Sequence, residues 1–326
     1  MPLRLRLLLF YLNYLAKQLD YFKLDAPTIR KINQREFDRV DPLIDYPAIA
    51  MDKVWEEEVE VRDGAKIPVR IYRPTPQKGL PLIVFYHGGG FVTRSIATHD
   101  KACRRIAHLN QSVVVSVGYR LAPEYKFPIP VYDCYDACRW AAEQASNVGA
   151  DEEKLVVMGD SAGGNLATVT SILARDHGGP AISAQVLIYP TVDGRLLSPT
   201  IDQFAKGYLL TKQQMQWFVK QYQSTPEDVF DPLMSPILTE DLSNLPPTFI
   251  CTAEYDPLKG EGADYAVRLK EAGNQVWYKD YKKTIHAFLN LPRITVRVNE
   301  ELQEDIRAFL RKRFASLSSS SSIRFE

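Results

Sequence analysis

The stretch Leu155-Val-Val-Met-Gly-Asp-Ser-Ala-Gly-Gly164 joins a short apolar run to a serine, Ser161, that is flanked by small residues. Its Gly-x-Ser-x-Gly pentapeptide also occurs in sequences by chance. Here it follows a predicted buried strand and opens a predicted helix, the context in which a sharp turn lifts a serine hydroxyl above a sheet. The dipole of a helix N-terminus favours developing negative charge. The sequence therefore predicts Ser161 as a nucleophile; a glycine-rich helix cap with Ser161 as the capping residue is the alternative.

Other short apolar runs lie on both sides of this stretch and predict the rest of a sheet. Unbroken apolarity over strand length indicates burial on both faces, as in a parallel sheet between helices. Helical patterns separate the runs, and this alternation predicts an open, doubly wound α/β sheet. Residues 54–62 and 67–72, joined by Asp63-Gly64, predict an antiparallel edge. The apolar runs are 82–86, 113–117, 155–158, 186–189 and 248–251, and the helical patterns are 101–109, 131–145, 162–176 and 260–272.

Two further segments have helical character: one precedes this alternation and the other interrupts it. We expect N-terminal helices over residues 1–50 and a helical insertion over residues 192–224. The α/β core then comprises residues 51–191 and 225–315, and its last helix ends near residue 314. Residues 316–326 are rich in serine and predict a disordered tail.

An apolar run at residues 7–15 follows Arg4 and Arg6 and superficially copies a signal peptide. No small-residue cleavage pattern follows it, and it is shorter than the roughly 20 apolar residues that span a bilayer. We expect an amphipathic helix that covers an apolar surface, and a membrane anchor is the alternative.

The net charge and the cysteines bear on possible ligands, metal sites and the cellular compartment. Forty basic and forty acidic side chains give a formal net charge of zero, which is not the basic footprint of a protein that binds nucleic acid or an anionic membrane. The four cysteines include no Cys-x-x-Cys pair and have no histidine cluster nearby, so no structural metal site is expected. Free cysteines are often small core residues, and we therefore expect a reducing compartment, the cytoplasm.

A second glycine-rich stretch, His87-Gly-Gly-Gly-Phe91, directly follows the predicted strand at residues 82–86. Acyl transfer creates an oxyanion, which preorganised backbone N–H groups stabilise. Glycines let consecutive amides turn inward, because no Cβ blocks the conformation or the ligand. We expect Gly89 and Gly90 to form this oxyanion hole with the amide of Ala162. Gly88 and Gly89 are the alternative donor pair, and an ordinary glycine-rich loop is the alternative to the whole assignment.

Serine is a weak nucleophile until an adjacent base takes its proton. Of the five histidines, His286 lies after the predicted strand at residues 275–282 and ahead of the final helix. Open α/β sheets carry their sites at this carboxyl end of the strands. His99 and His108 flank or lie in a predicted helix, His177 ends another, and His87 is expected to orient the glycine loop. The sequence therefore predicts His286 as the catalytic base.

The base requires a carboxylate to orient it, and Asp256 is the candidate. It follows the predicted strand at residues 248–251, and the chain order is then Ser161, Asp256, His286, as expected of this type of site. Glu254 is the rival acid. Asp160 is too constrained by the turn at the serine to serve.

With these residues identified, the chain from about residue 50 to 315 resembles the hormone-sensitive-lipase-like family of α/β-hydrolase esterases. The resemblance implies a core sheet of eight strands under a helical cap, which would combine N-terminal cap helices over residues 1–50 with a cap insertion over residues 192–224. It also implies hydrolysis of esters with short to medium acyl chains without a cofactor. The motifs that carry it, in chain order, are His87-Gly-Gly-Gly-Phe91, Tyr119-Arg-Leu-Ala-Pro-Glu124, Gly159-Asp-Ser-Ala-Gly-Gly164, Tyr189-Pro190 and Asp256-Pro-Leu258.

The resemblance also implies an ion pair of Arg120 with Glu124 behind the site. The chain departs from the family pattern at two positions. Gly260 stands where an acidic residue is usual, and Ala287 follows the predicted base where glycine is common. Neither change removes a catalytic group, so we expect altered loop detail and an intact activity.

The expected protein is thus a serine carboxylesterase that forms an acyl-enzyme. Its expected partner is a small-molecule ester; we expect no nucleic acid and no stable membrane insertion. A homodimer through the strand at residues 275–282 is a further possibility. One alternative is a binding protein like the plant gibberellin receptors, which resemble the family but lack the catalytic histidine. Another is an amidase or long-chain lipase with the same triad, since apolar segments at residues 3–15 and 208–210 would tolerate a long chain.

Overall fold

The computed structural model describes residues 1–18 and 24–321 of the chain. Eight strands form one sheet in the order β1-β2-β4-β3-β5-β6-β7-β8. β1 pairs antiparallel with β2, and β2 antiparallel with β4, while all the other neighbours are parallel. The predicted antiparallel edge and the mostly parallel sheet of eight strands are confirmed. The strands are β1 Lys53–Glu60, β2 Lys66–Arg73, β3 Leu80–Tyr86, β4 Val113–Val117, β5 Ala150–Asp160, β6 Ala184–Ile188, β7 Thr248–Tyr255 and β8 Val276–Ile285.

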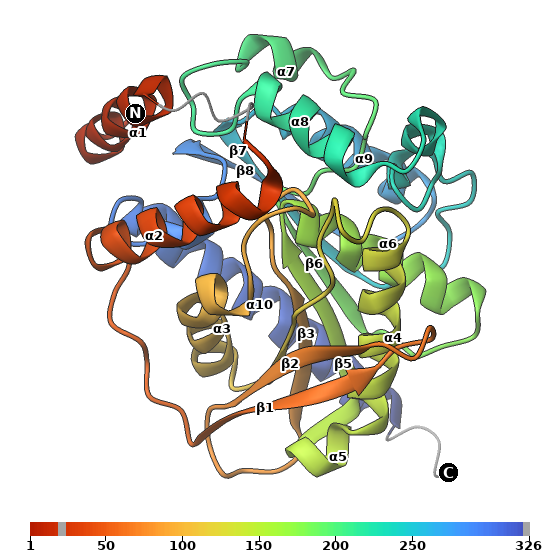
Figure 1. Cartoon of the computed structure of the whole chain (residues 1–326). Coiled ribbons are helices and arrows are strands. Elements are labelled where there is room, and N and C mark those ends of the chain that lie inside the picture. Colours follow the sequence, from red (N-terminus) through yellow and green to blue (C-terminus); the bar gives the residue numbers. More distant parts are fainter. Residues whose placement is uncertain (19–23, 322–326) are drawn as a thin grey trace.

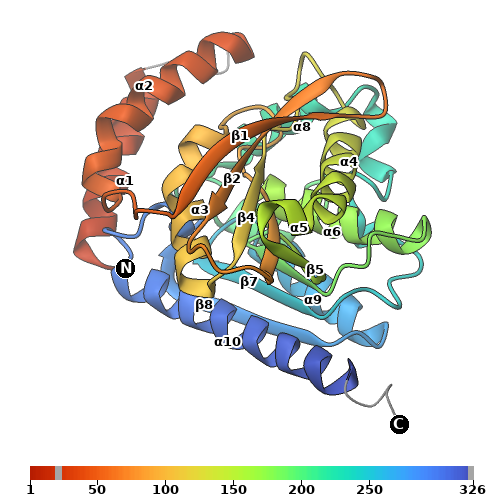
Figure 2. The ribbon, with the colours of Figure 1, turned by 90° about the horizontal axis from the view of Figure 1, so that it is seen from below.

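Helices cover both faces of the sheet (Figures 1 and 2). α4, α6 and α9 pack on one face, and α3 and α10 pack on the other. The α-helices are α1 Leu3–Gln18, α2 Ala26–Ile44, α3 Ile96–Asn110, α4 Ile129–Glu143, α5 Ala145–Val148, α6 Ala162–Asp176, α7 Pro199–Gln203, α8 Lys212–Tyr222, α9 Lys259–Glu271 and α10 Val296–Ser321. Three short 3₁₀ helices are η2 Pro226–Phe230, η3 Pro236–Leu238 and η4 Phe288–Asn290.

The sequence of β4 explains why two helical layers form. Val113, Val115 and Val117 pack into the layer of α4 and α6, while Val114 packs into the layer of α3 and α10. Successive side chains of a strand face opposite sides of the sheet, so a strand with apolar side chains on both faces needs apolar partners on both. All four valines are completely buried.

The N-terminal helices and the segment around residue 208 meet beside the end of β8. Figure 1 shows α7 and α8 at the top of the molecule, with α1 to their left. Leu3, Leu7 and Phe10, on the other side of α1, are exposed. No helix within the described ranges is long and apolar enough to cross a membrane. The buried cluster that joins these elements consists of Leu5, Leu9, Ile44, Ile285 and Leu291, with Tyr208 and Leu209 packed against it.

The last helix, α10, extends further than the sequence analysis expected. The prediction ended it near residue 314 and placed a disordered tail from residue 316, whereas the structure continues the helix to Ser321. The Ser316 hydroxyl donates to the carbonyl of Arg313. Serine costs only about 0.5 kcal/mol per residue in a helix relative to alanine, so an established helix can run into a serine-rich segment. The rest of the predicted tail, residues 322–326, lies outside the described residues.

Candidate active site

Ser161 lies at the sharp turn between β5 and α6. Its backbone has φ 55° and ψ −119°, a conformation that non-glycine residues adopt only under constraint. A Cβ at position 159 would lie 2.2 Å from the carbonyl oxygen of Gly163, and one at position 163 would lie 1.9 Å from that of Tyr86. The two glycines of the motif are therefore required by the close approach of β3 and the turn, which presents the serine at the carboxyl end of the sheet.

His286 bridges Ser161 and Asp256. Its Nε2 lies 2.9 Å from the Ser161 hydroxyl, and its Nδ1 lies 2.7 Å from Oδ2 of Asp256. Asp256 is fully buried, and its Oδ1 accepts a hydrogen bond from the backbone N–H of Leu258. A carboxylate only accepts, so Nδ1 carries the proton and Nε2 is left to accept from the serine hydroxyl. Turns at the ends of β5, β7 and β8 supply the three side chains.

The rival acids lie elsewhere. Glu254 accepts a hydrogen bond from the backbone N–H of Lys283 at 2.6 Å and has no contact with His286. Asp160 accepts a hydrogen bond from the N–H of Gly88 at 2.9 Å and lies 3.2 Å from Nε2 of His99. Of the three carboxylates considered from the sequence, Asp256 is the one that contacts the imidazole.

The glycine loop after β3 keeps several amides open. Gly89 and Gly90 have φ of +123° and +61°, which side chains rarely allow, and a Cβ at position 90 would overlap the ring of Phe218 in α8. Gly88 is already committed to Asp160. Within the described residues no acceptor lies on the amides of Gly89, Gly90 or Ala162. This arrangement favours the expected set of donors over the alternative pair of Gly88 and Gly89.

His87 is built into the same loop. Its Nδ1 lies 2.8 Å from the carbonyl oxygen of Gly88, and its ring stacks on Tyr119 at a centroid distance of 4.4 Å. The Tyr119 hydroxyl donates to the His87 carbonyl. Burial, together with the positive charge of nearby His99, lowers the pKa of His87 to about 3. A neutral ring held in this way is suited to orienting the loop.

Glu261, in α9, has a place near the site that the sequence did not reveal. The backbone N–H of Thr191 donates to the carbonyl of Ser161 at 3.3 Å. Glu261 holds this same loop, because its Oε1 accepts from the Thr191 hydroxyl and from the N–H of Val192. Burial, reinforced by the charge of Asp193, raises the pKa of Glu261 to about 8. A lone glutamate in a helical pattern gives no signal of donors that precede it by 69 residues.

The ion pair expected between Arg120 and Glu124 is wrong. Arg120 pairs with Asp133 at 2.7 Å and with Asp63 at 2.8 Å, while Glu124 pairs with Arg30 of α2 at 2.6 Å. Asp133 is fully buried and needs a cation, so it takes Arg120, and the more exposed Glu124 is left to bind the N-terminal helices. The two residues thus serve different layers of the molecule.

Both departures from the family pattern have local consequences. At position 260 a Cβ would lie 2.1 Å from the Ser198 hydroxyl, so the segment leading into α7 packs where a side chain would otherwise stand. Ala287 has φ 62°, a left-handed conformation that costs alanine roughly 1–2 kcal/mol. The chain tolerates it directly after His286, and the hydrogen bonds of His286 are in place.

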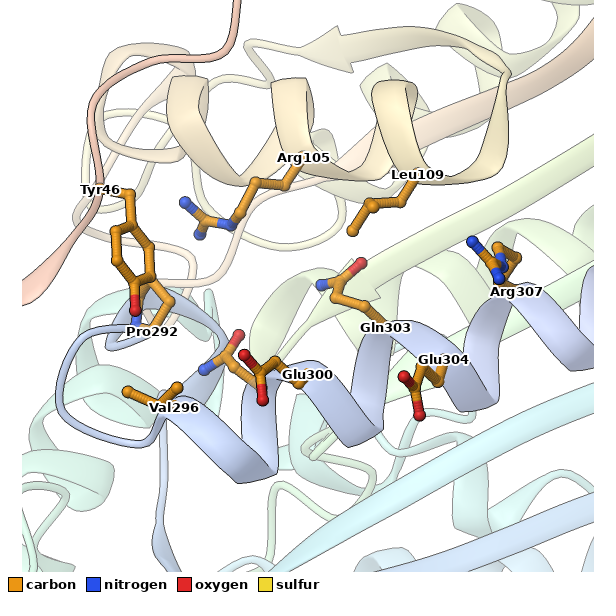
Figure 3. A pocket seen from close by; sticks show the side chains of 10 residues that line it. Tyr46, Arg105, Leu109, Pro292, Val296, Glu300, Gln303, Glu304 and Arg307 are labelled. Atoms are coloured by element: carbon orange, nitrogen blue, oxygen red, sulfur yellow. The ribbon is translucent and has the colours of Figure 1, made fainter.

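A pocket of about 240 Å³ lies away from this site, between α3 and α10 (Figure 3). No triad residue lines it, but Arg105 at its edge donates to the carbonyl of Leu289 in η4. The pocket lining is Tyr46, Arg105, Leu109, Pro292, Val296, Asn299, Glu300, Gln303, Glu304 and Arg307.

Within the described ranges no group of three or more His, Cys, Asp or Glu is arranged to hold a metal ion.

Known proteins resemble this chain over most of its length. A family described as having the alpha/beta hydrolase fold matches residues 83–290. An arylesterase from Saccharolobus solfataricus is 38% identical over 288 residues, which is 87% of this chain and 91% of that protein. An ethyl acetate hydrolase from Pseudomonas putida is 38% identical over 292 residues, covering 88% and 90%. A solved hyperthermophilic esterase from Pyrobaculum calidifontis superposes with a TM-score of 0.89 at 41% identity, covering 96% of this chain and 98% of its own.

Proposed function

The chain belongs to the hormone-sensitive-lipase-like family of α/β hydrolases, and we propose that this carboxylic ester hydrolase cleaves short- to medium-chain esters through Ser161, Asp256 and His286. One observation carries the proposal: the imidazole of His286 is hydrogen-bonded to the serine on one side and to the buried carboxylate on the other. An adjacent base that is itself oriented by a third group is what activates a serine.

Acylation follows from these roles. Nε2 of His286 takes the Ser161 proton as Oγ attacks the ester carbonyl carbon. The resulting oxyanion accepts hydrogen bonds from the amides of Gly89, Gly90 and Ala162, which need no rearrangement to donate. Asp256 holds the tautomer of His286 and stabilises the imidazolium. When the tetrahedral intermediate collapses, Nε2 gives its proton to the departing alcohol, and an acyl group remains on Oγ.

Deacylation repeats these steps with water. His286 takes a proton from a water molecule, whose oxygen attacks the acyl carbon and forms a second oxyanion at the same amides. Collapse of this intermediate releases the carboxylic acid and returns the proton from Nε2 to Ser161. The cycle balances without a cofactor, since each proton that the imidazole accepts is passed on in the same half-reaction.

We also propose that α1, α2 and the segment over residues 192–224 form a cap. Two contacts support it: the ring of Phe218 in α8 lies directly over Gly90, and the cluster of Leu5, Leu9 and Ile44 reaches Ile285, next to His286. A cap this close to the reacting atoms limits the space for the acyl chain. The name of the Pseudomonas putida relative, an ethyl acetate hydrolase, is in keeping with a short acyl group.

For the cellular location we propose the cytoplasm. All four cysteines are buried and unpaired. Disulfides persist in oxidising compartments, and buried free thiols are typical of reducing ones. Oxidation of any of these thiols to a disulfide in protein isolated from its source would contradict this proposal.

The test of the function is hydrolysis of p-nitrophenyl butyrate, with and without a fluorophosphonate that labels activated serines. Ser161→Ala is expected to lower turnover by on the order of 10⁴-fold or more and to abolish labelling. Ser171→Ala is the matched control: this buried hydroxyl of α6 donates only to the carbonyl of Ala167, and the variant should keep its activity.

Other outcomes would contradict parts of the proposal. Near-normal turnover of Ser161→Ala would rule out this nucleophile. A protein that neither turns over nor becomes labelled would instead be a binding protein on the same fold. Rates on acetyl, hexanoyl and palmitoyl esters test the substrate class, and a maximum at palmitoyl would overturn the preference for short to medium chains.

A further inference from the structure

Besides His286 and Asp256, a second buried histidine–carboxylate pair, His99 with Asp160, contacts the glycine loop at Gly88. We propose that His99 is a positioning residue for the oxyanion hole, acting through Asp160 on the backbone of Gly88. The inference rests on the proposed function, since it concerns amides that act only if an oxyanion forms. His99 comes from α3, and Asp160 is the residue before the nucleophile.

Asp160 connects α3 to the loop. Its Oδ1 accepts the N–H of Gly88 at 2.9 Å and lies 3.2 Å from Nε2 of His99. Both ionisable side chains are almost wholly buried, with exposed fractions of 3% and 4%. A Cβ at position 88 would lie 2.8 Å from the other carboxylate oxygen, so only glycine can approach this closely. The burial of Asp160 acts to raise its pKa, but the charge and hydrogen bond of His99 and the Gly88 amide outweigh it and lower the pKa overall.

The contacts of His99 indicate that its ring donates from both nitrogens. Nδ1 lies 3.0 Å from the Thr98 hydroxyl, whose own proton is donated to the carbonyl of Ser95. The Thr98 oxygen can therefore only accept from Nδ1, and the carboxylate can only accept from Nε2. Nδ2 of Asn290 lies 3.3 Å from the same Nε2. Exchange of the amide nitrogen and oxygen by a flip of this side chain places an acceptor against Nε2. An imidazolium thus supplies the counter-charge that a buried carboxylate requires.

The pair bears on the oxyanion hole through the geometry of one peptide unit. His87 Nδ1 donates to the carbonyl oxygen of Gly88, while Asp160 holds the N–H of the same residue. The carbonyl of Gly88 and the N–H of Gly89 belong to one planar trans peptide and point in opposite directions. Fixing Gly88 on both sides therefore fixes the direction of the Gly89 N–H, one of the proposed oxyanion donors.

The test compares His99→Leu with His99→Gln in the full-length enzyme. Leucine removes the donor to Asp160, whereas the glutamine amide can replace it. We expect His99→Leu to lower kcat by about 10- to 100-fold with little change in KM, because a misdirected oxyanion donor costs up to 10²–10³ in kcat. His99→Gln should recover most of this loss. His108→Leu, an exposed histidine of the same helix, is the control and should match the parent enzyme.

A trifluoromethyl ketone separates this role from a merely structural one. Its adduct with Ser161 places an oxyanion in the hole, so its inhibition constant should weaken in His99→Leu by the same factor as kcat. Asp160→Asn removes the charge of the same network, and the double variant should lose no more than the worse single one. Thermal melts of each variant report on folding separately.

Three results would overturn the inference: an unchanged kcat in a folded His99→Leu, a fall in kcat without weaker ketone binding, or additive losses in the double variant. Failure of the proposed function would be recognised differently. In that case the parent enzyme itself would show neither turnover nor fluorophosphonate labelling, whatever the residue at position 99.

Discussion

At the residue scale, Ser161, the proposed nucleophile, occupies a backbone conformation that its neighbours impose. The N–H of Ser161 donates to the carbonyl of Ile188, and its own carbonyl accepts from Thr191 and Gly164. Such a conformation costs roughly 1–3 kcal/mol and persists only where the surroundings over-determine it. The result is a hydroxyl held 2.9 Å from His286 before any substrate binds.

Replacement of Asp256 by asparagine tests the orientation of the base. The asparagine amide can donate to Nδ1, which would leave the proton on Nε2 and prevent that nitrogen from accepting from Ser161. We expect kcat to fall by about 10⁴-fold, measured with p-nitrophenyl butyrate at saturating concentration. The control is Glu254→Gln, the rival acid, which should remain active; a larger loss there than in Asp256→Asn would reverse the assignment.

At the scale of elements, loops from distant parts of the chain are tied together around the turn at Ser161. α9 holds the loop after β6 through the buried carboxyl of Glu261, and this loop in turn contacts the Ser161 carbonyl. Oε2 of Glu261 has no partner among the described residues. A carboxyl that is buried without a cation is more stable when protonated, which makes this contact sensitive to pH.

Glu261→Gln should therefore change how stability depends on pH. The folded pKa is about 8 against an ordinary value of 4.5, so the folded state binds the proton more tightly than the unfolded state. The stability that this group contributes is complete below pH 4.5 and is lost as the pH rises through 8. Relative to the variant, the parent should lose up to about 1.4 kcal/mol of unfolding free energy per pH unit in this window.

Urea titrations at pH 5, 6, 7 and 8 measure the unfolding free energy of the parent and of Glu261→Gln. The contributions of all other titrating groups cancel when the two proteins are compared. Glu271→Gln provides the control, because Glu271 is exposed on the same helix and should leave the pH dependence unchanged. Stabilities of parent and Glu261→Gln that run parallel from pH 5 to 8 would show that Glu261 is charged in the folded protein.

Between α3 and α10 lies a buried side chain whose replacement should stabilise the protein. Gln303 projects from α10 into the gap between the helices (Figure 3), is 7% exposed, and has no hydrogen-bond partner for either amide atom in the described structure. Burying unpaired polar atoms costs about 1–3 kcal/mol. Gln303→Leu should therefore raise the melting temperature by about 2 °C.

Calorimetry of Gln303→Leu beside Gln185→Leu provides a matched comparison. Gln185 is also buried, at 0% exposed, but its Nε2 donates to the Thr248 hydroxyl at 2.8 Å. Its replacement should lower the melting temperature. A decrease in both variants would show that the Gln303 amide is satisfied in solution.

At the scale of the whole molecule, the N-terminal helices are fastened to the core by charges as well as by apolar packing. Arg30 of α2 binds Glu124, Asp41 binds Lys101 of α3, and Asp45, which follows α2, binds Arg105 at 2.5 Å. Two ion pairs along α2 and one directly after it orient this helix over the layer that carries His99. The net charge of the chain is zero, and some of its opposite charges are paired where α2 meets the core.

The sheet ends at β8, and among the described strands none pairs with its outer edge. An unpaired edge is a template for another chain, so we expect two copies to associate through the strand Val276–Ile285. Light scattering over a concentration series should give a mass that approaches twice that of the 37.1 kDa chain. A mass that stays at that of the monomer at the highest concentration would reject this arrangement.

Much of the site could be predicted because its signals are short-range. The spacing of glycines around Ser161 reports a turn, and the positions of Asp256 and His286 just after apolar runs report strand ends, which the sheet brings to one edge. The partners of Asp160 and Arg120 carried no such signal. The turn at the serine predicts that Asp160 is too constrained to be the acid but does not predict its partner, which in the structure is the N–H of Gly88.

Sequence alone thus predicts the α/β sheet, Ser161 as the candidate nucleophile and the chain order of the proposed triad, since each is encoded within a strand, a turn or a motif of a few residues. The choice between Gly88 and Gly90 as donors, the separate partners of Arg120 and Glu124, and the buried supports His99 and Glu261 arise only on packing. These contacts join residues as far apart as 191 positions, and burial removes the water that would otherwise satisfy every donor and acceptor equally.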